Sequence, residues 1–145
     1  MSAGPFRRVL VGWDASANAA EALTAAAAIV GDGAGHVVAL TVVPAGQGAE
    51  AADEQRSDQA AIRRRAEERF ERLRGSAAAG VRMSLHIVED RQVGRAVCAY
   101  AAEHGFDLLV LGRHGDGRAL RSRLGRVAET AARDSQVPVL LLGPP

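Results

Sequence analysis

The sequence predicts an α/β protein in which parallel strands alternate with helices, and three observations support this fold class. Short apolar runs typical of buried strands alternate with helix-like patterns along the whole chain. The length of 145 residues suits one compact domain, which we expect to span residues 1–145. Hydrophobic residues make up 48% of the chain and many of them are alanine, so helices can pack closely on a sheet. Such an alternation predicts a single open, parallel sheet with helices on both faces.

The first strand and helix follow from the pattern near the N-terminus. Residues 7–14 form an apolar run that ends in Asp14, as expected of a buried strand, and Trp13 either anchors this strand in the core or lines a crevice. Ser16 or Asn18 can cap the following helix, which is predicted to end at residue 30, because both side chains accept hydrogen bonds from free N–H groups. Glycines directly after this helix end it.

A polar stretch separates the second strand from the second helix. Residues 36–43 predict a buried strand, and residues 45–56, rich in glycine, alanine, glutamine and acids, predict a mobile surface connection. The helix that follows carries charges of both signs, so its arginines predict a solvated face rather than a nucleic-acid patch. Its apolar stripe consists of Ile62, Ala66, Phe70 and Leu73.

The second half of the chain continues the alternation. Residues 81–88, 108–111 and 137–142 predict strands, whereas residues 93–104 and 127–133 predict helices. In an open parallel sheet, the ligand crevice lies at the carboxyl ends of the strands, where the strand order reverses. The residues that directly follow the predicted strands are therefore the candidates for a binding site.

A glycine-rich loop after residues 108–111 is the clearest of these candidates. Gly112 ends the apolar run, Gly115 follows it, and Gly125 precedes the helix that begins near Val127. Backbone N–H groups and the positive end of a helix dipole would meet there around one small space, which favours an anion such as phosphate. Glycine suits these positions because a side chain would block the approach of the backbone to the ligand. The same glycines could instead serve only a tight turn.

Composition excludes several other functions. All 18 basic residues are arginine, so no mechanism can use a P-loop lysine or a Schiff base. A single cysteine excludes a disulfide framework and a cysteine zinc site, and the histidines lack metal-ligand spacing. A net charge of +1 gives no reason to expect a nucleic acid or a membrane as a partner. Without a signal-peptide or membrane-span pattern, we expect a cytoplasmic protein.

Four features resemble the universal stress protein family, and the resemblance covers nearly the whole chain. They are residues 11–16 (Val-Gly-Trp-Asp-Ala-Ser), residues 107–112, the Gly-x2-Gly-x9-Gly spacing of Gly112, Gly115 and Gly125, and residues 137–140. The family implies a flavodoxin-like, Rossmann-like sheet of five parallel strands in the order 3-2-1-4-5. It also implies a homodimer paired through the last strand, from Val137 to Leu142, and a bare apolar edge strand would itself invite a partner strand.

For one branch of the family, the resemblance implies an ATP site. The acid after the first strand lies near the ribose, the phosphates or a magnesium ion in that branch, which makes Asp14 the candidate here. The end of the second strand, at Val42 or Val43, would frame the adenine. Candidate residues for the phosphates are Gly112, Arg113, His114, Gly115, Gly125, Arg126 and Val127.

One position departs from the family pattern. ATP-binding members have Ser or Thr directly after the last glycine, whereas this chain has Arg126, whose guanidinium could pair with phosphate, fill the pocket or point to solvent. We expect a regulatory stress-response module without dedicated catalytic machinery that binds ATP, with or without Mg²⁺, or another adenine nucleotide. The alternatives are a dimeric interaction protein whose vestigial pocket does not bind ATP, and slow ATP hydrolysis in which Asp14 holds Mg²⁺.

Overall fold

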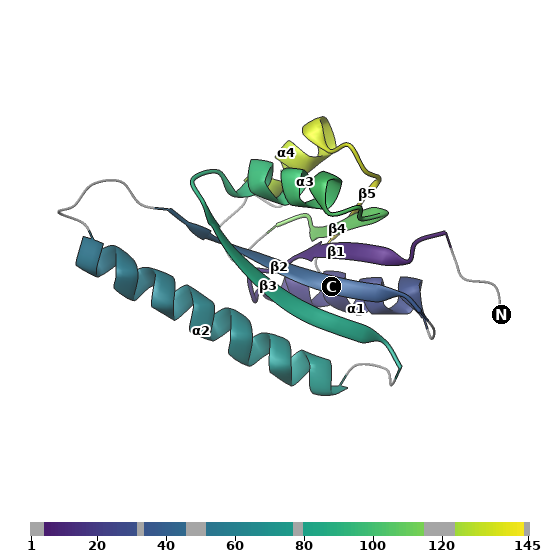
Figure 1. Ribbon diagram of the computed structural model, residues 1–145, viewed down its shortest axis with the longest axis horizontal. Helices are drawn as coiled ribbons and strands as arrows, with labels where there is room; N and C mark the ends of the chain where they lie inside the picture. The colour runs from purple at the N-terminus through teal and green to yellow at the C-terminus, as the bar shows by residue number, and fades with distance from the viewer. Residues whose placement is uncertain (1–4, 32–33, 46–51, 77–79, 115–123, 144–145) are drawn as a thin grey trace.

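The computed structural model describes residues 5–31, 34–45, 52–76, 80–114 and 124–143, which form a twisted sheet of five parallel strands (Figure 1). The strands lie in the order β3-β2-β1-β4-β5, which confirms the predicted order. Because parallel neighbours need crossover connections, a helix follows each of the first four strands. The strands are β1 (Arg8–Gly12), β2 (His36–Pro44), β3 (Arg82–Asp90), β4 (Leu108–Gly112) and β5 (Val139–Leu142).

Helices cover both faces of the sheet, as the alternation predicted (Figure 1). Val9 and Val11 of β1 belong to the core on the face of α1 and α2, whereas Leu10 belongs to the core on the face of α3 and α4. All three side chains are fully buried, which explains why this strand is a continuous apolar run rather than an alternating one. The helices are α1 (Ala17–Val30), α2 (Ala52–Ser76), α3 (Val93–Glu103) and α4 (Arg126–Asp134).

Ser16, rather than Asn18, caps α1. The Ser16 hydroxyl accepts a hydrogen bond from the Ala19 N–H at 3.1 Å, which satisfies one of the free donors of the first turn. Asn18 lies inside that turn and is buried. Its amide makes hydrogen bonds to distant segments of the chain, so the two cap candidates have different roles.

The expected connection over residues 45–56 is too long, because α2 already begins at Ala52. Two acids lie in its first turn, where negative charge interacts favourably with the helix dipole. Gln59 Nε2 donates to the Pro44 carbonyl at 2.9 Å and ties the start of the helix to the end of β2. No apolar stripe marks this part of the sequence, so periodicity did not predict the helix. Residues 46–51 lie outside the described part of the chain.

The predicted stripe of α2 is only partly in the core. Ala66 and Phe70 are buried and Leu73 packs against the same core, but Ile62 is 36% exposed. The difference arises because α2 extends along the sheet to its carboxyl edge, where Ile62 borders a cavity rather than a strand. Among the helices that the structure describes, none is long and apolar enough to cross a membrane.

The last strand is shorter than expected. The predicted range 137–142 contains regular strand only from Val139 to Leu142. Pro138 has no N–H to donate to the ladder, although its carbonyl still accepts from the Leu109 N–H at 2.9 Å.

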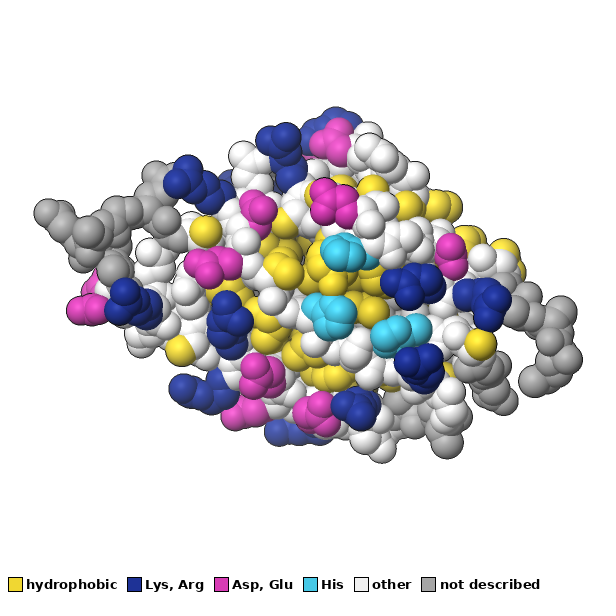
Figure 2. All heavy atoms as spheres, viewed as in Figure 1, with side chains coloured by type: hydrophobic (Ala, Val, Ile, Leu, Met, Phe, Trp, Pro, Cys, Tyr) yellow, Lys and Arg dark blue, Asp and Glu magenta, His cyan; other side chains and the backbone are white. Residues whose placement is uncertain are grey.

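Histidine side chains gather on the face of the sheet near β3 and α3 (Figure 2). His36 Nε2 lies 2.9 Å from the Ser84 hydroxyl, and His86 Nδ1 is hydrogen-bonded to the Tyr100 hydroxyl. The Tyr100 ring also packs on His104, with ring centroids 4.1 Å apart. The sheet thus brings together histidines that are far apart in the sequence.

We expect acidification to destabilise the fold through His36. Burial, the neighbouring charges of Arg82 and Arg8, and His86 lower the pKa of His36 from its ordinary value of 6.5. Below about pH 6.5 the unfolded chain therefore binds more protons than the folded chain. The free energy of unfolding decreases as the pH is lowered through this range, and it recovers when the pH is raised above about 6.5. Urea denaturation between about pH 5 and about pH 8 measures this dependence.

A His36→Gln variant is the control, because glutamine cannot be charged in this range but can still reach Ser84. The variant should lose less stability on acidification than the parent protein. Equal losses in the two proteins would contradict the assignment to His36.

Candidate functional site

A cavity of about 910 Å³ opens at the carboxyl edge of the sheet, between the tips of β1, β2 and β4 and the first turns of α3 and α4. Its position follows from the topology. The chain leaves β1 through α1 toward β2, whereas it leaves β4 through α4 toward β5. Connections that depart in opposite directions leave a crevice between two neighbouring strands. The cavity is large enough for a small organic ligand.

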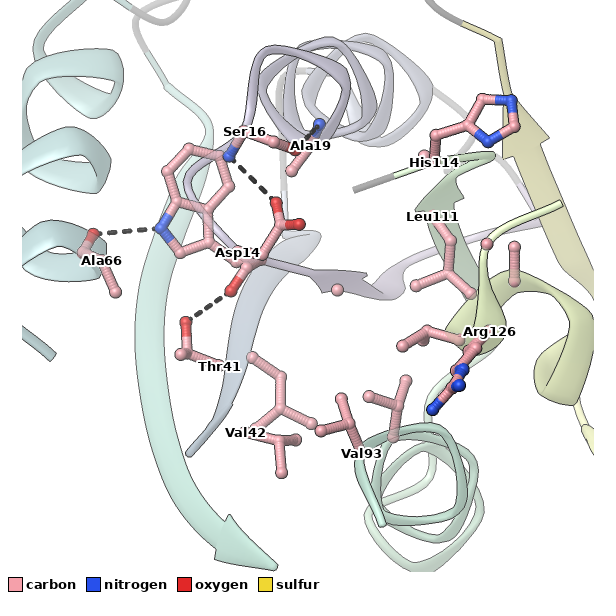
Figure 3. A pocket seen from close by; sticks show the side chains of 18 of the residues that line it. Asp14, Ser16, Ala19, Thr41, Val42, Ala66, Val93, Leu111, His114 and Arg126 are labelled. Atoms are coloured by element: carbon pink, nitrogen blue, oxygen red, sulfur yellow. Dashed lines mark hydrogen bonds between the residues drawn. The ribbon is translucent and has the colours of Figure 1, made fainter. Parts of the chain in front are cut away.

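Asp14 lies on the β1 side of the cavity with one carboxylate oxygen already engaged (Figure 3). Its Oδ1 accepts a hydrogen bond from the Ser16 N–H at 2.9 Å, which leaves Oδ2 for a ligand. The turn depends on Ala15, whose φ of 65° lies in the left-handed region and costs about 1–2 kcal/mol for a residue with a side chain. Arg69 of α2 donates from Nη1 to the Ala15 carbonyl at 2.7 Å and stabilises this turn.

Trp13 both borders the cavity and packs in the core, so it has both of the roles that were expected as alternatives. The side chain is only 4% exposed, and its ring packs edge to face against Phe70, with centroids 6.4 Å apart. Its Nε1 donates to the Ala66 carbonyl at 3.0 Å, and its own carbonyl accepts from the Thr41 hydroxyl at 2.7 Å. These contacts anchor the residue directly before Asp14 to α2 and β2.

Apolar side chains line the middle of the cavity. Val42 of β2 and Val93 of α3 lie side by side along one edge of it in Figure 3, and Leu111 of β4 and Ile62 of α2 also border it. The alternative to Val42, Val43, is fully buried and does not border the cavity. Successive residues of a strand point to opposite faces, so only one of the two valines can face this space.

The first turn of α4 borders the cavity with N–H groups that no side chain of the described residues caps. Gly125 is the N-cap and offers no side chain, and the first intrahelical bond runs from the Glu129 N–H to the Gly125 carbonyl at 2.9 Å. The N–H groups of Arg126, Val127 and Ala128 therefore have no acceptor within the helix. All three residues border the cavity. A helix N-terminus of this kind attracts negative charge.

Arg126 adds a positive charge at the same end of the cavity. Its side chain is exposed, and the guanidinium makes no hydrogen bond or ion pair with any residue that the structure describes. Figure 3 shows the side chain directed toward Val93 at the border of the cavity. Arg113 also borders the cavity, so the charge at this end is positive.

The described part of the glycine loop places Gly112 and His114 at the cavity, whereas Gly115 lies outside the described residues. The reason for glycine at position 112 differs from the expected one: a Cβ there would lie 2.7 Å from Asn18 Cγ. The missing side chain thus makes room for an amide rather than for a ligand. The His114 ring points away from the middle of the cavity in Figure 3, and its Nδ1 is buried without a hydrogen-bond partner in the described part of the chain.

Sequence reasoning missed the contributions of α1, α2 and α3. Asn18, Ile62, Arg69 and Val93 lie far along the chain from the glycine loop, yet all contact the cavity or the backbone around it. Only Asn18 carried a signal, since an amide is unusual in such an alanine-rich helix.

The arrangement suits a ligand with an anionic end, an apolar middle and hydroxyl groups. The helix N-terminus and the arginines attract an anion, the valines contact a flat apolar group, and the free oxygen of Asp14 accepts hydrogen bonds. Within the described ranges, no group of three or more His, Cys, Asp and Glu could hold a metal ion.

Solved structures share this fold. The universal stress protein UspA from Lactobacillus plantarum has 19% identity over 96% of this chain and 99% of its own, with a TM-score of 0.77. A universal stress protein in complex with cAMP has 25% identity over 99% of this chain and 100% of its own, with a TM-score of 0.68. A universal stress protein family protein from Arabidopsis thaliana with AMP bound has 17% identity over 95% of this chain and 92% of its own, with a TM-score of 0.68.

Sequence comparison leads to the same family. No curated protein sequence matches the chain significantly. The sequence profile of the universal stress protein family matches residues 5–143, which is nearly the whole chain, and the strand order agrees with the order that this resemblance implies. The chain belongs to the universal stress protein family.

Proposed function

We propose that the chain binds an adenine nucleotide of the ATP type in this cavity and acts as a regulatory stress-response module. One observation carries the proposal: an uncapped helix N-terminus with the Arg126 guanidinium lies on one side of the cavity, and the acid Asp14 lies on the other. A nucleotide has the complementary parts, namely an anionic phosphate chain, ribose hydroxyls and a flat base.

The phosphates belong at the α4 end. The N–H groups of Arg126, Val127 and Ala128 supply donors, and the Arg126 guanidinium replaces the hydroxyl that ATP-binding members of the family have at this position. A guanidinium pairs with two phosphate oxygens at once, which a hydroxyl cannot do. The replacement is therefore compatible with phosphate binding.

The base belongs along the apolar middle of the cavity, and the ribose at the Asp14 side. Val42, Val93 and Ile62 offer apolar surface to an adenine ring. Asp14 Oδ2 can accept hydrogen bonds from ribose hydroxyls, or hold Mg²⁺ together with phosphate oxygens. Two relatives support an adenine nucleotide as the ligand: one forms a complex with cAMP and the other has AMP bound.

We propose regulation rather than turnover because both hydroxyls and one carboxylate oxygen that the described residues place at the cavity are engaged in its backbone. The Thr41 hydroxyl donates to the Trp13 carbonyl. The Ser16 hydroxyl accepts the Ala19 N–H, and Asp14 Oδ1 accepts the Ser16 N–H. None of these contacts pairs a nucleophile with a general base, which covalent catalysis requires.

Replacing Arg126 with alanine should weaken ATP binding about tenfold or more, because the charge-assisted hydrogen bonds of its guanidinium to phosphate are lost. Titration calorimetry measures the affinity, and the fluorescence of Trp13, the single tryptophan, gives a second readout beside the cavity. The matched control is Arg133→Ala in the last turn of α4, where the guanidinium pairs with Asp134 at 3.3 Å.

Equal losses in the two variants would contradict the role of Arg126. A parent protein that binds neither ATP, AMP nor cAMP at millimolar concentration would favour the alternative, a dimeric interaction protein with a vestigial pocket.

The Asp14→Asn variant should weaken ATP binding more in the presence of Mg²⁺ than in EDTA. Asparagine keeps the oxygen that accepts the Ser16 N–H, but it loses the charge that would hold the metal ion. In EDTA the carboxylate repels the phosphates, so its removal should cost little or even help. Calorimetric titrations in the two buffers make the comparison. Equal weakening in both would assign Asp14 to the ribose alone.

We further propose a homodimer in which β5 pairs with β5 of a second copy. β5 lies at the end of the strand order, and Val139, Leu140, Leu141 and Leu142 are all only half-buried. A symmetric partner strand would satisfy the edge backbone groups and cover these side chains.

A Leu141→Lys variant should dissociate this dimer, since a buried lysine at the centre of the paired strands is costly. The control is Ile87→Lys, which places the same charge at a half-buried position on β3, the opposite edge of the sheet. Light scattering over a dilution series measures the mass of each protein. A monomeric parent, or a Leu141→Lys variant that dimerises as well as the control, would refute the proposed interface.

A further inference from the structure

Asn18 connects three segments that meet beside the cavity. Its side-chain Nδ2 donates to the Leu142 carbonyl at 3.0 Å and to the Gly143 carbonyl at 3.1 Å, at the end of β5. Its Oδ1 accepts the His114 N–H at 3.0 Å, in the glycine loop. The residue itself belongs to the first turn of α1 and is 6% exposed.

These partners allow only one orientation of the amide. Both hydrogens of Nδ2 are used by carbonyl oxygens, and Oδ1 meets an N–H donor. A rotated amide would place its oxygen against the Leu142 and Gly143 carbonyls. Gly112 makes this position possible, because a Cβ there would lie 2.7 Å from Asn18 Cγ and 2.8 Å from Oδ1.

The bond to His114 adjoins contacts that link the described start of the loop to α4. Arg113, the preceding residue, donates its N–H to the Leu142 carbonyl at 2.7 Å and accepts the Gly125 N–H at 2.7 Å. Gly125 is the N-cap of α4, so the position of Arg113 determines where the first turn of that helix lies. Asn18 and Arg113 share the Leu142 carbonyl as an acceptor, which locks the start of the loop to the end of β5.

We infer that Asn18 is a positioning residue: it holds the start of the glycine loop against β5 and thereby aims the N-terminus of α4 into the cavity. It does not contact the ligand, and it does not border the cavity. Its effect on affinity rests on the proposed nucleotide binding, whereas its effect on the loop does not.

The test compares Asn18→Ala with Val37→Ala, which removes buried apolar volume at the far end of β2 without touching the loop. Hydrogen exchange of individual backbone amides by NMR, in the ligand-free protein, should show faster exchange at His114 in Asn18→Ala only. ATP affinity by calorimetry should fall about tenfold in the same variant, the loss expected if the displaced first turn of α4 makes one hydrogen bond fewer to phosphate. Gly112→Ala is the second variant, because its Cβ displaces the amide of Asn18 without deleting a polar group.

Faster exchange at His114 in Asn18→Ala and Gly112→Ala, with the control unchanged at that amide, supports the role. Unchanged His114 exchange in both variants overturns it, as does a His114 effect of the same size in Val37→Ala. A parent protein that binds no ATP overturns the proposed function alone, because the exchange measurement still decides the role of Asn18.

Discussion

The parallel pairing of β1 with β4 is the constraint on which the rest of this structure depends. Val9 lies opposite Leu108 and Val11 opposite Val110, and the side chains on this central pair are almost completely buried. The chain then departs from the two strands in opposite directions, which leaves a crevice at their carboxyl ends. The same pairing that closes the core therefore leaves a cavity above it.

The backbone around that cavity is held by side chains from distant elements. Arg69 of α2 stabilises the left-handed turn at Ala15, and Asn18 of α1 holds the loop at His114. Trp13 is anchored to α2 through the Ala66 carbonyl. A binding loop is usually positioned by the helices and strands around it. In this protein, side chains of α1 and α2 hold the loops by hydrogen bonds to the loop backbone. Substitutions at these positions of α1 or α2 would therefore change the position of the backbone around the cavity.

Long-range features of the fold could be predicted, whereas several local assignments could not. The alternation of apolar strands with helices indicated helices on both faces, and the family resemblance supplied the strand order. The start of α2 at Ala52 was missed because its first turns carry no apolar stripe and are held by a side-chain bond of Gln59 to β2. Ser16 and Asn18 are both good caps in sequence, but only contacts with other segments distinguish them.

By itself, the sequence determined the class of the fold, the membership of the family and the chemical types gathered at the carboxyl edge of the sheet. The fold class and the chemical types follow from periodicity and spacing, which are local properties of the chain, and the family follows from the resemblance of its motifs. The tertiary structure alone decided that Val42 rather than Val43 borders the cavity and that Gly112 makes room for Asn18. It also decided that the Arg126 side chain borders the cavity. Each of these depends on which elements pack against one another, and such contacts join residues too far apart in the sequence for any local pattern to relate them.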